Sequence, residues 1–327
     1  MNKTALITGA AGFIASHLAE KLLSEGYKVI GLDNFDDFYH RSIKEKNIER
    51  LRFFGKEKFE FHEMDLRNAA DFELLPNKID IVFHIAGKAG VRPSIEAPSD
   101  YIETNISGTQ NVLDWMKNIQ CDKLIFASSS SIYGNNKKVP FSESDDVNAP
   151  ISPYAFTKRS NELQIHTFHH LSQLNAVCLR FFTVYGPRQR PDLAIRKFVT
   201  RIHNGEAIDQ YGDGSTGRDY TYISDIINGV YSAANYLFEN ENVFEIINLG
   251  SHSPVSLKEM IDTIGTTLNK NPIINVINMQ PGDVEITYAD ISKAKKLLGY
   301  EPKVSFEKGI KQFVDWFDKE GSIDSTK

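Results

Sequence analysis

Cysteine is scarce in this sequence, with only Cys121 and Cys178 among 327 residues. Both lie in apolar or strand-like runs, so we expect buried thiols in a reducing compartment and not a disulfide framework. No apolar run reaches the roughly 18 residues that cross a membrane. The start, MNKTALITGAAGFIA, loosely mimics a signal peptide, but its glycines and the polar helix behind it argue against one. These absences predict a soluble, cytoplasmic protein.

An excess of basic residues is also missing. The chain has 37 Lys and Arg against 43 Asp and Glu, a net charge of −6 at pH 7. This balance gives no basic field for nucleic acid or anionic lipid, so a phosphate ligand would need locally placed cations. His166, His169 and His170 share a helix, but no cysteine or carboxylate cluster joins them. We therefore expect no metal site.

The first half of the chain alternates strand and helix patterns. Most of the strands are continuous apolar runs, as is typical of parallel strands that are covered on both faces. They are expected at 4–9, 28–33, 58–65, 80–87, 123–129, 176–182 and 245–250, with helices at 13–25, 99–118 and 154–171. The alternation predicts an α/β fold with a Rossmann-like, doubly wound parallel sheet.

After about residue 183 the pattern changes to loops rich in Pro and Gly, with helices near 192–204, 256–269 and 305–318. We interpret these as a smaller, discontinuous lobe at the carboxyl edge of the sheet, where open α/β sheets bind ligands. The expected division is a dinucleotide-binding domain of residues 1–183 plus about 222–251, and a substrate-binding lobe of about 184–221 plus 252–320.

A glycine-rich turn, TGAAGFIASH, follows the first strand and opens the first helix. Gly9 and Gly12 fit a turn whose backbone approaches a pyrophosphate at a helix N-terminus, and Ala15 is small enough for close packing at the third position. Asp33 ends the second strand, where a carboxylate accepts hydrogen bonds from a ribose diol and repels a 2′-phosphate. The pattern favours NAD over NADP, with a bare glycine turn and a plain turn aspartate as the alternatives.

Residues after the third and fourth strands lie at the same edge of the sheet. Asp65 and Leu66 follow one of these strands, and Ala86, Gly87 and Lys88 follow the other. They are candidates for the walls around the adenine and the dinucleotide backbone. Structural caps are the competing interpretation.

The segment SPYAFTK holds Tyr154 and Lys158 four residues apart, one above the other on a helix face. A phenol with a pKa near 10 is a poor base at neutral pH. An ammonium one turn away favours the phenolate and brings this pKa toward the working range. Downstream of a dinucleotide turn, this spacing indicates a catalytic pair.

These motifs together resemble the extended short-chain dehydrogenase/reductase family, in its branch of nucleotide-sugar epimerases and dehydratases. The resemblance runs nearly from end to end, through SSSSIYG, RFFTVYGP, GRDYTYISD and ADISKAKKLLGYEP. Within that branch the chain is most similar to the UDP-glucuronate 4-epimerases, on LDNFDDFY, AGVRPS, RFFTVYGPRQRPD and YGDGSTGRDYTYISDI.

The resemblance implies roles for individual residues. Tyr154 would be the base for the sugar 4-hydroxyl, Lys158 would hold the NAD ribose, and Ser129 would assist at the same hydroxyl. Further NAD contacts would fall on Phe13, Ile14, Asn34 and Asn105. Arg218 and Arg92 would bind the UDP phosphates and Asp283 the uridine ribose. The chain departs from the family at Ala15 and at Gln280, where many relatives have an arginine.

Ser130 and Ser131 occupy two positions where dehydratases of the family carry Asp-Glu and decarboxylases carry Glu at the second. Serine is a poor acid or base, which argues against elimination. The two hydroxyls, with Thr183 and the Arg190 cation, could instead hold a substrate carboxylate that a glutamate would repel. Alternatively, Ser130 and Ser131 only satisfy backbone groups, and Arg190 is a surface cation.

The sequence therefore predicts an isomerase that epimerises UDP-glucuronate to UDP-galacturonate with NAD. The alternatives, in order, are a 4-epimerase of neutral UDP-hexoses, a UDP-glucuronate decarboxylase and a non-catalytic NAD-binding scaffold. Relatives dimerise through a four-helix bundle of the helices at 99–118 and 154–171. Trp115, Phe168 and Leu171 on these helices lead us to expect the same homodimer here.

Overall fold

The computed structural model describes residues 3–278 and 286–321. Asp283 and Gln280 lie outside the described residues. Within the described part of the chain, no helix is long and apolar enough to cross a membrane.

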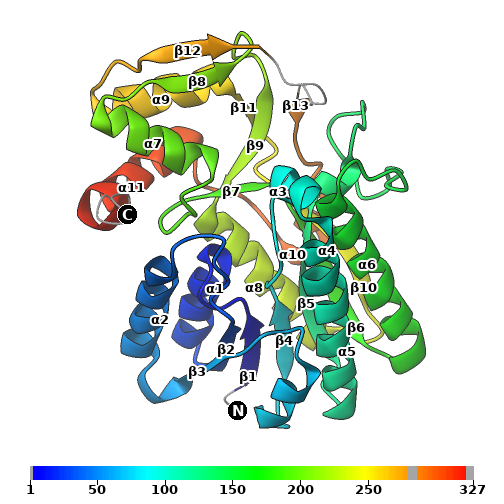
Figure 1. Ribbon diagram of the computed structural model, residues 1–327. Helices are drawn as coiled ribbons and strands as arrows, with labels where there is room; N and C mark the ends of the chain where they lie inside the picture. Colours follow the sequence, from blue (N-terminus) through cyan, green and yellow to red (C-terminus); the bar gives the residue numbers. More distant parts are fainter. Residues whose placement is uncertain (1–2, 279–285, 322–327) are drawn as a thin grey trace.

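The centre of the molecule is a seven-stranded sheet of parallel strands in the order β10-β6-β5-β4-β1-β2-β3 (Figure 1). Its strands are β1 (Thr4–Thr8), β2 (Lys28–Asp33), β3 (Phe59–Glu63), β4 (Ile81–His84), β5 (Lys123–Ser129), β6 (Asn175–Phe181) and β10 (Phe244–Leu249). The order reverses between β1 and β4, which makes the sheet doubly wound and confirms the predicted fold class.

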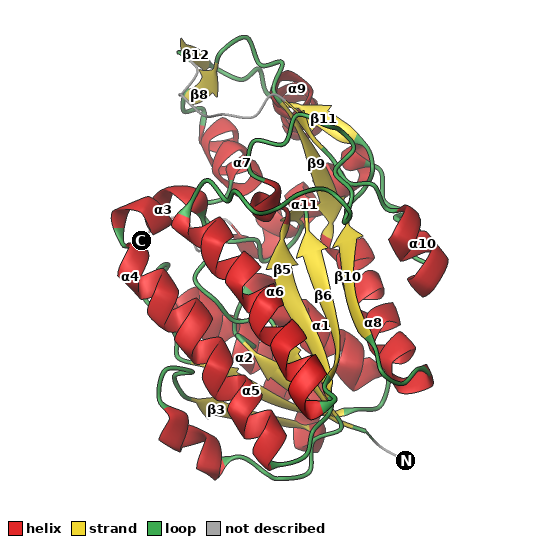
Figure 2. Ribbon diagram, turned by 90° about the vertical axis from the view of Figure 1, so that its right-hand side faces the viewer, coloured by secondary structure: helices red, strands yellow, loops and turns green. Residues whose placement is uncertain are grey.

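Helices cover both faces of this sheet, which explains why its strands are continuously apolar. In β1, the side chains of Ala5 and Ile7 belong to one hydrophobic cluster and that of Leu6 to the other. The helices of the first face are α1 (Phe13–Ser24), α2 (Arg41–Gly55) and α8 (Ile223–Glu239), and those of the second are α5 (Gly108–Asn118) and α6 (Pro153–Ser172). Figure 2 shows α5 and α6 side by side in front of the sheet.

The helix expected over 99–118 is present and runs without a gap, but its winding changes along its length. A short helix α4 (Pro98–Tyr101) and a π-helical stretch η3 (Ile102–Ser107) come before α5. The backbone carbonyl of Asn105, within η3, accepts hydrogen bonds from the side chains of Thr109 and Asn161. Both hydrogen bonds come from residues outside η3, and they occur where the helix is widened to π-helical geometry. Such a local distortion is frequent at functional sites.

A second group of elements lies across the carboxyl edge of the central sheet, at the top of Figure 1. Its strands are β7 (Thr183–Tyr185), β8 (Ile208–Tyr211), β9 (Gly217–Tyr222), β11 (Pro254–Ser256), β12 (Ile274–Ile277) and β13 (Ile286–Thr287). Its helices are α7 (Ala194–Asn204), α9 (Leu257–Leu268) and α11 (Phe306–Trp316), while α10 (Ser292–Leu298) packs on α8 and β10. The expected helices after residue 183 are therefore present.

The remaining elements are short and connect the larger ones. They are α3 (Val91–Glu96), the 3-10 turns η1 (Lys56–Lys58), η2 (Ala69–Leu74) and η4 (Ser130–Tyr133), and the π-helical turn η5 (Phe317–Gly321).

Buried Asp219 fastens the second group of elements to the central sheet. Its carboxylate accepts hydrogen bonds from the backbone amides of Ser251, His252 and Ala289, after β10 and before α10. Since Asp219 lies on β9, this single side chain fixes where β9 crosses the sheet edge.

Candidate active site

A cavity of about 460 Å³ opens at the carboxyl edge of the central sheet. Most of the residues that the sequence singled out line it. They are Gly9, Gly12, Phe13, Ile14, Asp33, Asn34, Asp65, Leu66, Ala86, Gly87, Lys88, Ser129, Ser130, Tyr154, Lys158, Thr183 and Arg190. Asn105, Arg92, Ser131 and Arg218 are absent from the described lining.

The glycine turn at the start of α1 forms one end of the cavity. Gly9 has φ +72°, and a β-carbon there would stand 2.9 Å from the Cα of Ala86. Gly12 is the N-cap of α1, so the first amides of that helix open toward the cavity. Ala15 is only 1% exposed and is accommodated as a core residue of α1. This close, side-chain-free backbone fits the dinucleotide that the sequence predicts.

Asp33 lies at the end of β2 with little exposed surface. Its carboxylate accepts hydrogen bonds from the amides of Ala11 at 3.2 Å and Phe35 at 2.8 Å. Burial raises the pKa of Asp33, and the nearby charge of Lys44 opposes this. The Lys44 amine is 3.8 Å from the carboxylate. The structure thus places the Asp33 carboxylate in the cavity lining, where it could accept hydrogen bonds from a ribose diol.

Asn34 and Asp65 form the side of the cavity next to Asp33. The amide of Asn34 donates to the carboxylate of Asp65 at 2.9 Å. Asp65 also accepts from Arg67, and these hydrogen bonds hold the pKa of Asp65 well below its usual range. The backbone carbonyl of Leu66 accepts from Asn111, which anchors this turn to α5.

Asn105 positions a neighbouring loop and does not line the cavity. It is 2% exposed, accepts from the amide of Lys88 at 2.8 Å and donates to the carbonyl of the same residue at 3.0 Å. The Lys88 amine is 3.2 Å from Asp36 and 3.6 Å from Asp100. Asn105 therefore sets the loop from which Lys88 reaches the cavity.

Tyr154 and Lys158 lie on the first turns of α6. Ser152 caps this helix, accepting from the amide of Ala155 at 3.1 Å. The amine of Lys158 donates to the carbonyl of Ala127 at 2.8 Å, and burial lowers the pKa of Lys158 to about 8. Burial raises the pKa of the Tyr154 phenol, while a hydrogen bond with Ser129 and the charge of Arg190 lower it.

The four consecutive serines have different surroundings. Ser128 belongs to the cavity lining, and its hydroxyl donates at 2.7 Å to Glu162, which does not. Those of Ser129 and Ser131 share a hydrogen bond of 2.9 Å, and Ser129 also accepts from the Ser131 amide. Ser130 and Ser129 line the cavity, whereas Ser131 reaches it only through Ser129. The expected direct contact from Ser131 is thus not supported by its position.

The candidate cations are spread over three elements. Arg190 lines the cavity and pairs with Asp192 at 2.8 Å. Arg92, on α3, lies over the ring of Tyr211 at 5.5 Å. Arg218, on β9, donates to the carbonyl of Gly217 at 2.8 Å. Only Arg190 of these three belongs to the cavity lining.

Sequence reasoning missed several residues at this site. Lys44 belongs to the charged stretch HRSIKEKNIERLRFFGKEK, whose composition is typical of a solvated helix, yet it is 6% exposed and lines the cavity. The cavity also includes Asp36, Tyr39, Thr104, Phe181 and Leu193. Ile43, Ile48 and Leu51 give α2 an apolar stripe, so the helix face of Lys44 could have been assigned from that period.

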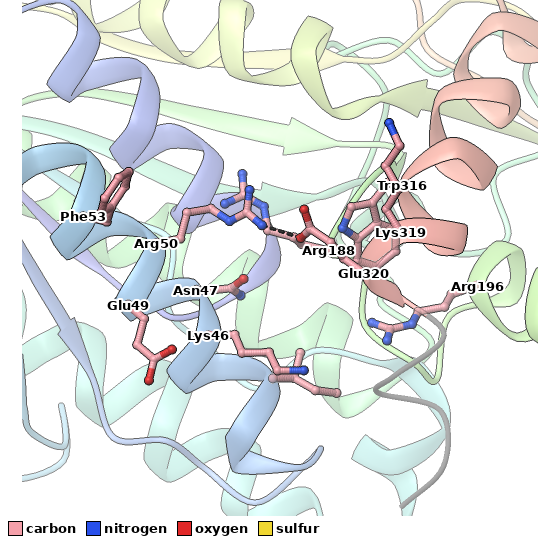
Figure 3. A pocket seen from close by; sticks show the side chains of 11 residues that line it. Lys46, Asn47, Glu49, Arg50, Phe53, Arg188, Arg196, Trp316, Lys319 and Glu320 are labelled. Carbon is pink, nitrogen blue, oxygen red and sulfur yellow. Dashed lines mark hydrogen bonds and ion pairs between the residues drawn. The ribbon is translucent and has the colours of Figure 1, made fainter.

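A second cavity, of about 570 Å³, lies between α2 and the end of α11 (Figure 3). Arg50 pairs with Glu320 across it, and Arg188 is held by Glu20 at 2.8 Å. None of the predicted site residues that the structure describes line this cavity. Among the described residues, no group of three or more His, Cys, Asp or Glu side chains is placed to hold a metal ion.

Known proteins resemble this chain over almost its full length. UDP-glucuronate 4-epimerase of Thermodesulfobacterium geofontis is 41% identical over 314 residues, 95% of each chain. The crystal structure of UDP-glucuronic acid 4-epimerase from Bacillus cereus, in complex with UDP-glucuronic acid and NAD, is 37% identical, with a TM-score of 0.90 over 97% of this chain and 99% of that one.

Neutral-sugar enzymes share the fold as well. The structure of UDP-glucose 4-epimerase from Thermotoga maritima with UDP-glucose is 31% identical, with a TM-score of 0.85 over 97% of this chain and 99% of that one. A family model described as GDP-mannose 4,6 dehydratase matches residues 6–313. The chain therefore belongs to this family of extended short-chain dehydrogenases/reductases.

Proposed function

We propose that this chain converts UDP-glucuronate to UDP-galacturonate. The general activity, NAD-dependent 4-epimerisation of a UDP-sugar, is that of an isomerase. The observation that carries the assignment is that one cavity joins the glycine turn and Asp33 to Tyr154, Lys158 and Ser129. A cofactor end and a proton-transfer end thus meet in a single space.

The cofactor end has the chemistry to bind NAD. When bound, the nicotinamide accepts a hydride from the substrate and gives it back. The backbone of the turn would contact the pyrophosphate, and Asp33 would accept from the adenosine ribose. The proposed contacts are Gly9, Gly12, Phe13, Ile14, Asp33, Asn34, Asp65, Leu66, Ala86, Gly87, Lys88, Tyr154 and Lys158, with Asn105 acting through Lys88.

Tyr154 is proposed to take the proton of the sugar 4-hydroxyl. Burial works against the phenolate, so the residue needs help from its neighbours. The Lys158 ammonium one turn away and the hydroxyl of Ser129 provide it. Loss of this proton together with the C4 hydride, which bound NAD would accept, leaves a 4-keto sugar, and the sugar must turn over before the hydride returns to the opposite face. The Ser129 hydroxyl would stay beside the sugar 4-oxygen whichever face of the sugar is turned toward the nicotinamide.

Ser130, Thr183 and Arg190 are proposed to bind the uronate carboxylate. Two hydroxyls and one guanidinium offer neutral and charged donors in the lining of the same cavity. Ser131 contributes indirectly, through its hydrogen bond with Ser129. A 4-keto uronate is a β-keto acid, and it loses carbon dioxide when the bond to the carboxylate aligns with the carbonyl π orbitals. Holding the carboxylate away from that alignment protects the product.

We assign the UDP moiety to the second group of elements. Arg218 and Arg92 are the proposed phosphate ligands and Asp283 the ligand of the uridine ribose. The contact of Arg92 with the ring of Tyr211 joins α3 to β8. This contact supports placing the UDP moiety where α3 meets the second group of elements. Residues 1–183 plus about 222–251 are accordingly the proposed NAD-binding domain, and about 184–221 plus 252–320 the UDP-sugar-binding lobe.

A cytoplasmic homodimer is the proposed form of the protein. Cys121 and Cys178 are buried free thiols, which suits a reducing compartment. Trp115 is buried in the core, Phe168 is partly buried against the same cluster, and Leu171 is 74% exposed. Exposed apolar side chains on α3, η3 and α6 support pairing of these helices with a second copy, namely Ile95, Ile102, Phe156, Leu163 and Leu171.

A 4-epimerase of neutral UDP-hexoses is the second candidate, because the Thermotoga maritima enzyme shares the fold at 31% identity. The two functions are separated by incubating the protein with UDP-glucuronate and with UDP-glucose and resolving the products by chromatography. UDP-galacturonate from the first sugar, with little turnover of the second, is the expected result. A pentose product would indicate decarboxylation, turnover of UDP-glucose alone would assign the second candidate, and an inert protein that binds NAD would indicate a scaffold.

A further inference from the structure

A buried ion pair lies behind the proposed catalytic residues. Glu162 is on α6, one turn after Lys158, and Arg180 is on β6. The guanidinium of Arg180 donates to both carboxylate oxygens of Glu162, with N–O distances of 2.9 Å in each case. Their side chains are 1% and 0% exposed. Both charges are therefore out of water and depend on each other.

Glu162 also ties α6 to the end of β5. Its carboxylate accepts from the hydroxyl of Ser128 at 2.7 Å. Ser128 lies between Ala127, whose carbonyl accepts from the Lys158 amine, and Ser129, which bonds Tyr154. The Glu162 carboxylate therefore fixes the segment of β5 in which Ala127 contacts Lys158 and Ser129 contacts Tyr154.

The network continues through Arg180 into a third strand. Arg180 donates to the phenol oxygen of Tyr133 at 3.0 Å. The Tyr133 hydroxyl in turn donates to Asn248 of β10 at 2.7 Å. The ion pair thus links β5, β6 and β10 at the carboxyl edge, so that Glu162 has little freedom to move.

We propose that Glu162 is a positioning residue for the reaction: its carboxylate holds the end of β5 against α6 and keeps a negative charge beside the Lys158 ammonium. Glu162 does not line the cavity, so it acts on Lys158 and not on the substrate. The inference rests on the proposed function, because it concerns how Tyr154 and Lys158 are prepared for proton transfer.

The charges around Lys158 make this effect measurable. Glu162 acts on Lys158 from α6, His84 from β4 and Cys178 from β6, while Arg180 and Arg159 pair with Glu162 at 2.9 and 3.2 Å. Burial lowers the pKa of His84 to about 3 and raises that of Cys178, so both stay neutral at pH 7. Burial lowers the pKa of Lys158 to about 8, and Cys178 and Glu162 oppose this.

The test is an NMR titration of the Lys158 side chain in protein labelled with ¹³C at the lysine ε-carbons. The resonance is assigned by its loss in Lys158→Arg. Glu162→Gln keeps the shape and an acceptor for Ser128 but removes the charge, so the Lys158 midpoint should fall by about one pH unit. Arg180→Met leaves Glu162 charged and paired only with Arg159, so the midpoint should rise. Opposite shifts are expected only if the charge of Glu162 acts on Lys158.

Ser128→Ala is the matched control, because it removes one hydrogen bond of Glu162 and leaves both charges. Its Lys158 midpoint should shift much less than that of Glu162→Gln, because both charges stay in place. If Glu162→Gln fails to fold, the double variant Glu162→Gln with Arg180→Met replaces it, and its midpoint should lie below that of Arg180→Met alone. Unchanged midpoints, or shifts in the same direction in Glu162→Gln and Arg180→Met, would overturn the proposal.

Epimerase kinetics provide the second measurement. In Glu162→Gln, the basic limb of the kcat profile should move to lower pH together with the NMR midpoint, with KM for the UDP-sugar changed less than twofold. A purely structural role lowers kcat equally at all pH values and would overturn the proposal. An inactive wild-type protein would refute the proposed function, whereas the NMR midpoints would still test Glu162, so the two failures are distinguishable.

Discussion

The Cα of Ala86 lies 2.9 Å from the position that a β-carbon on Gly9 would occupy. Gly9 follows β1 and Ala86 follows β4, the two strands between which the sheet order reverses. Gly9 also has φ +72°, a conformation that favours glycine. Two independent constraints therefore act on one residue at the point where open α/β sheets bind ligands.

Replacing Gly9 with Ala should separate these two constraints when Gly205→Ala is the control. Gly205 has nearly the same conformation, φ +73°, but nothing lies within 4 Å of its would-be β-carbon. Gly205→Ala should lower the free energy of unfolding by about 1 kcal/mol, and Gly9→Ala by roughly 2–4 kcal/mol because overpacking adds to the strain. Thermal unfolding and NAD titration measure the effects. Equal losses of stability and unchanged NAD affinity would contradict the close-approach argument.

Tyr154→Phe should remove the acid–base step and leave the fold intact. The expected loss in kcat is roughly 10²–10⁴-fold, with NAD affinity retained. Tyr133→Phe is the matched control, since its buried phenol bonds Arg180 and Asn248 and does not line the cavity. This control should lower stability by about 1–3 kcal/mol without a comparable loss in kcat per folded molecule. Product chromatography and thermal unfolding distinguish the two, and equal loss of kcat in both variants would argue against a catalytic role for Tyr154.

His84 should make the protein less stable in mild acid. The ring is 1% exposed and bonds Thr8 at 2.7 Å and Thr109 at 2.9 Å. Burial, and then the charge of Lys158, lower the pKa of His84 to about 3 in the folded state. The unfolded chain takes up the proton near pH 6.5 and the folded one does not. The contribution to stability is therefore present above pH 6.5 and is lost as pH falls from 6.5 toward 3.

Between pH 7 and pH 5 the wild type should lose about 2 kcal/mol more than His84→Gln, which cannot titrate. Denaturant unfolding at several pH values measures the difference. Parallel pH profiles for the two proteins would show that the folded state accommodates a charged His84.

The central sheet could be predicted from the sequence because most of its strands are continuous apolar runs. The π-helical stretch within the 99–118 helix could not, because it accompanies contacts of the Asn105 carbonyl with Thr109 and Asn161 that no local pattern reveals. Trp115 was misassigned for a similar reason. An apolar residue on a helix can serve an interface or the core, and here it packs on Phe72 of η2.

The site was predictable where one motif fixes several residues, as in the glycine turn and the Tyr154–Lys158 spacing. The serine run was not, because a strand end that enters a 3-10 turn points successive side chains in different directions. Ser128 faces Glu162 while Ser129 faces Tyr154. Lys44 was missed because the charged residues around it in the sequence are typical of a helix that is exposed to solvent.

Arg190 offers the sharpest test of substrate choice. Its guanidinium lines the cavity, lies over the ring of Phe38 at 4.9 Å and is paired with Asp192 at 3.0 and 2.8 Å. If it binds the uronate carboxylate, Arg190→Gln should raise KM for UDP-glucuronate roughly tenfold to a hundredfold, the value of a charged hydrogen bond. Any turnover of UDP-glucose should change little, and the fraction of pentose product should increase.

Asp192→Asn provides the opposing variant. It removes the anion that competes for Arg190, so KM for UDP-glucuronate should fall while the neutral sugar is unaffected. Both variants are compared by steady-state kinetics with the two sugars and by chromatography of the products. Equal effects on charged and neutral sugars would mean that Arg190 binds a part common to both, such as the diphosphate. The carboxylate would then have to be held by Ser130 and Thr183 alone.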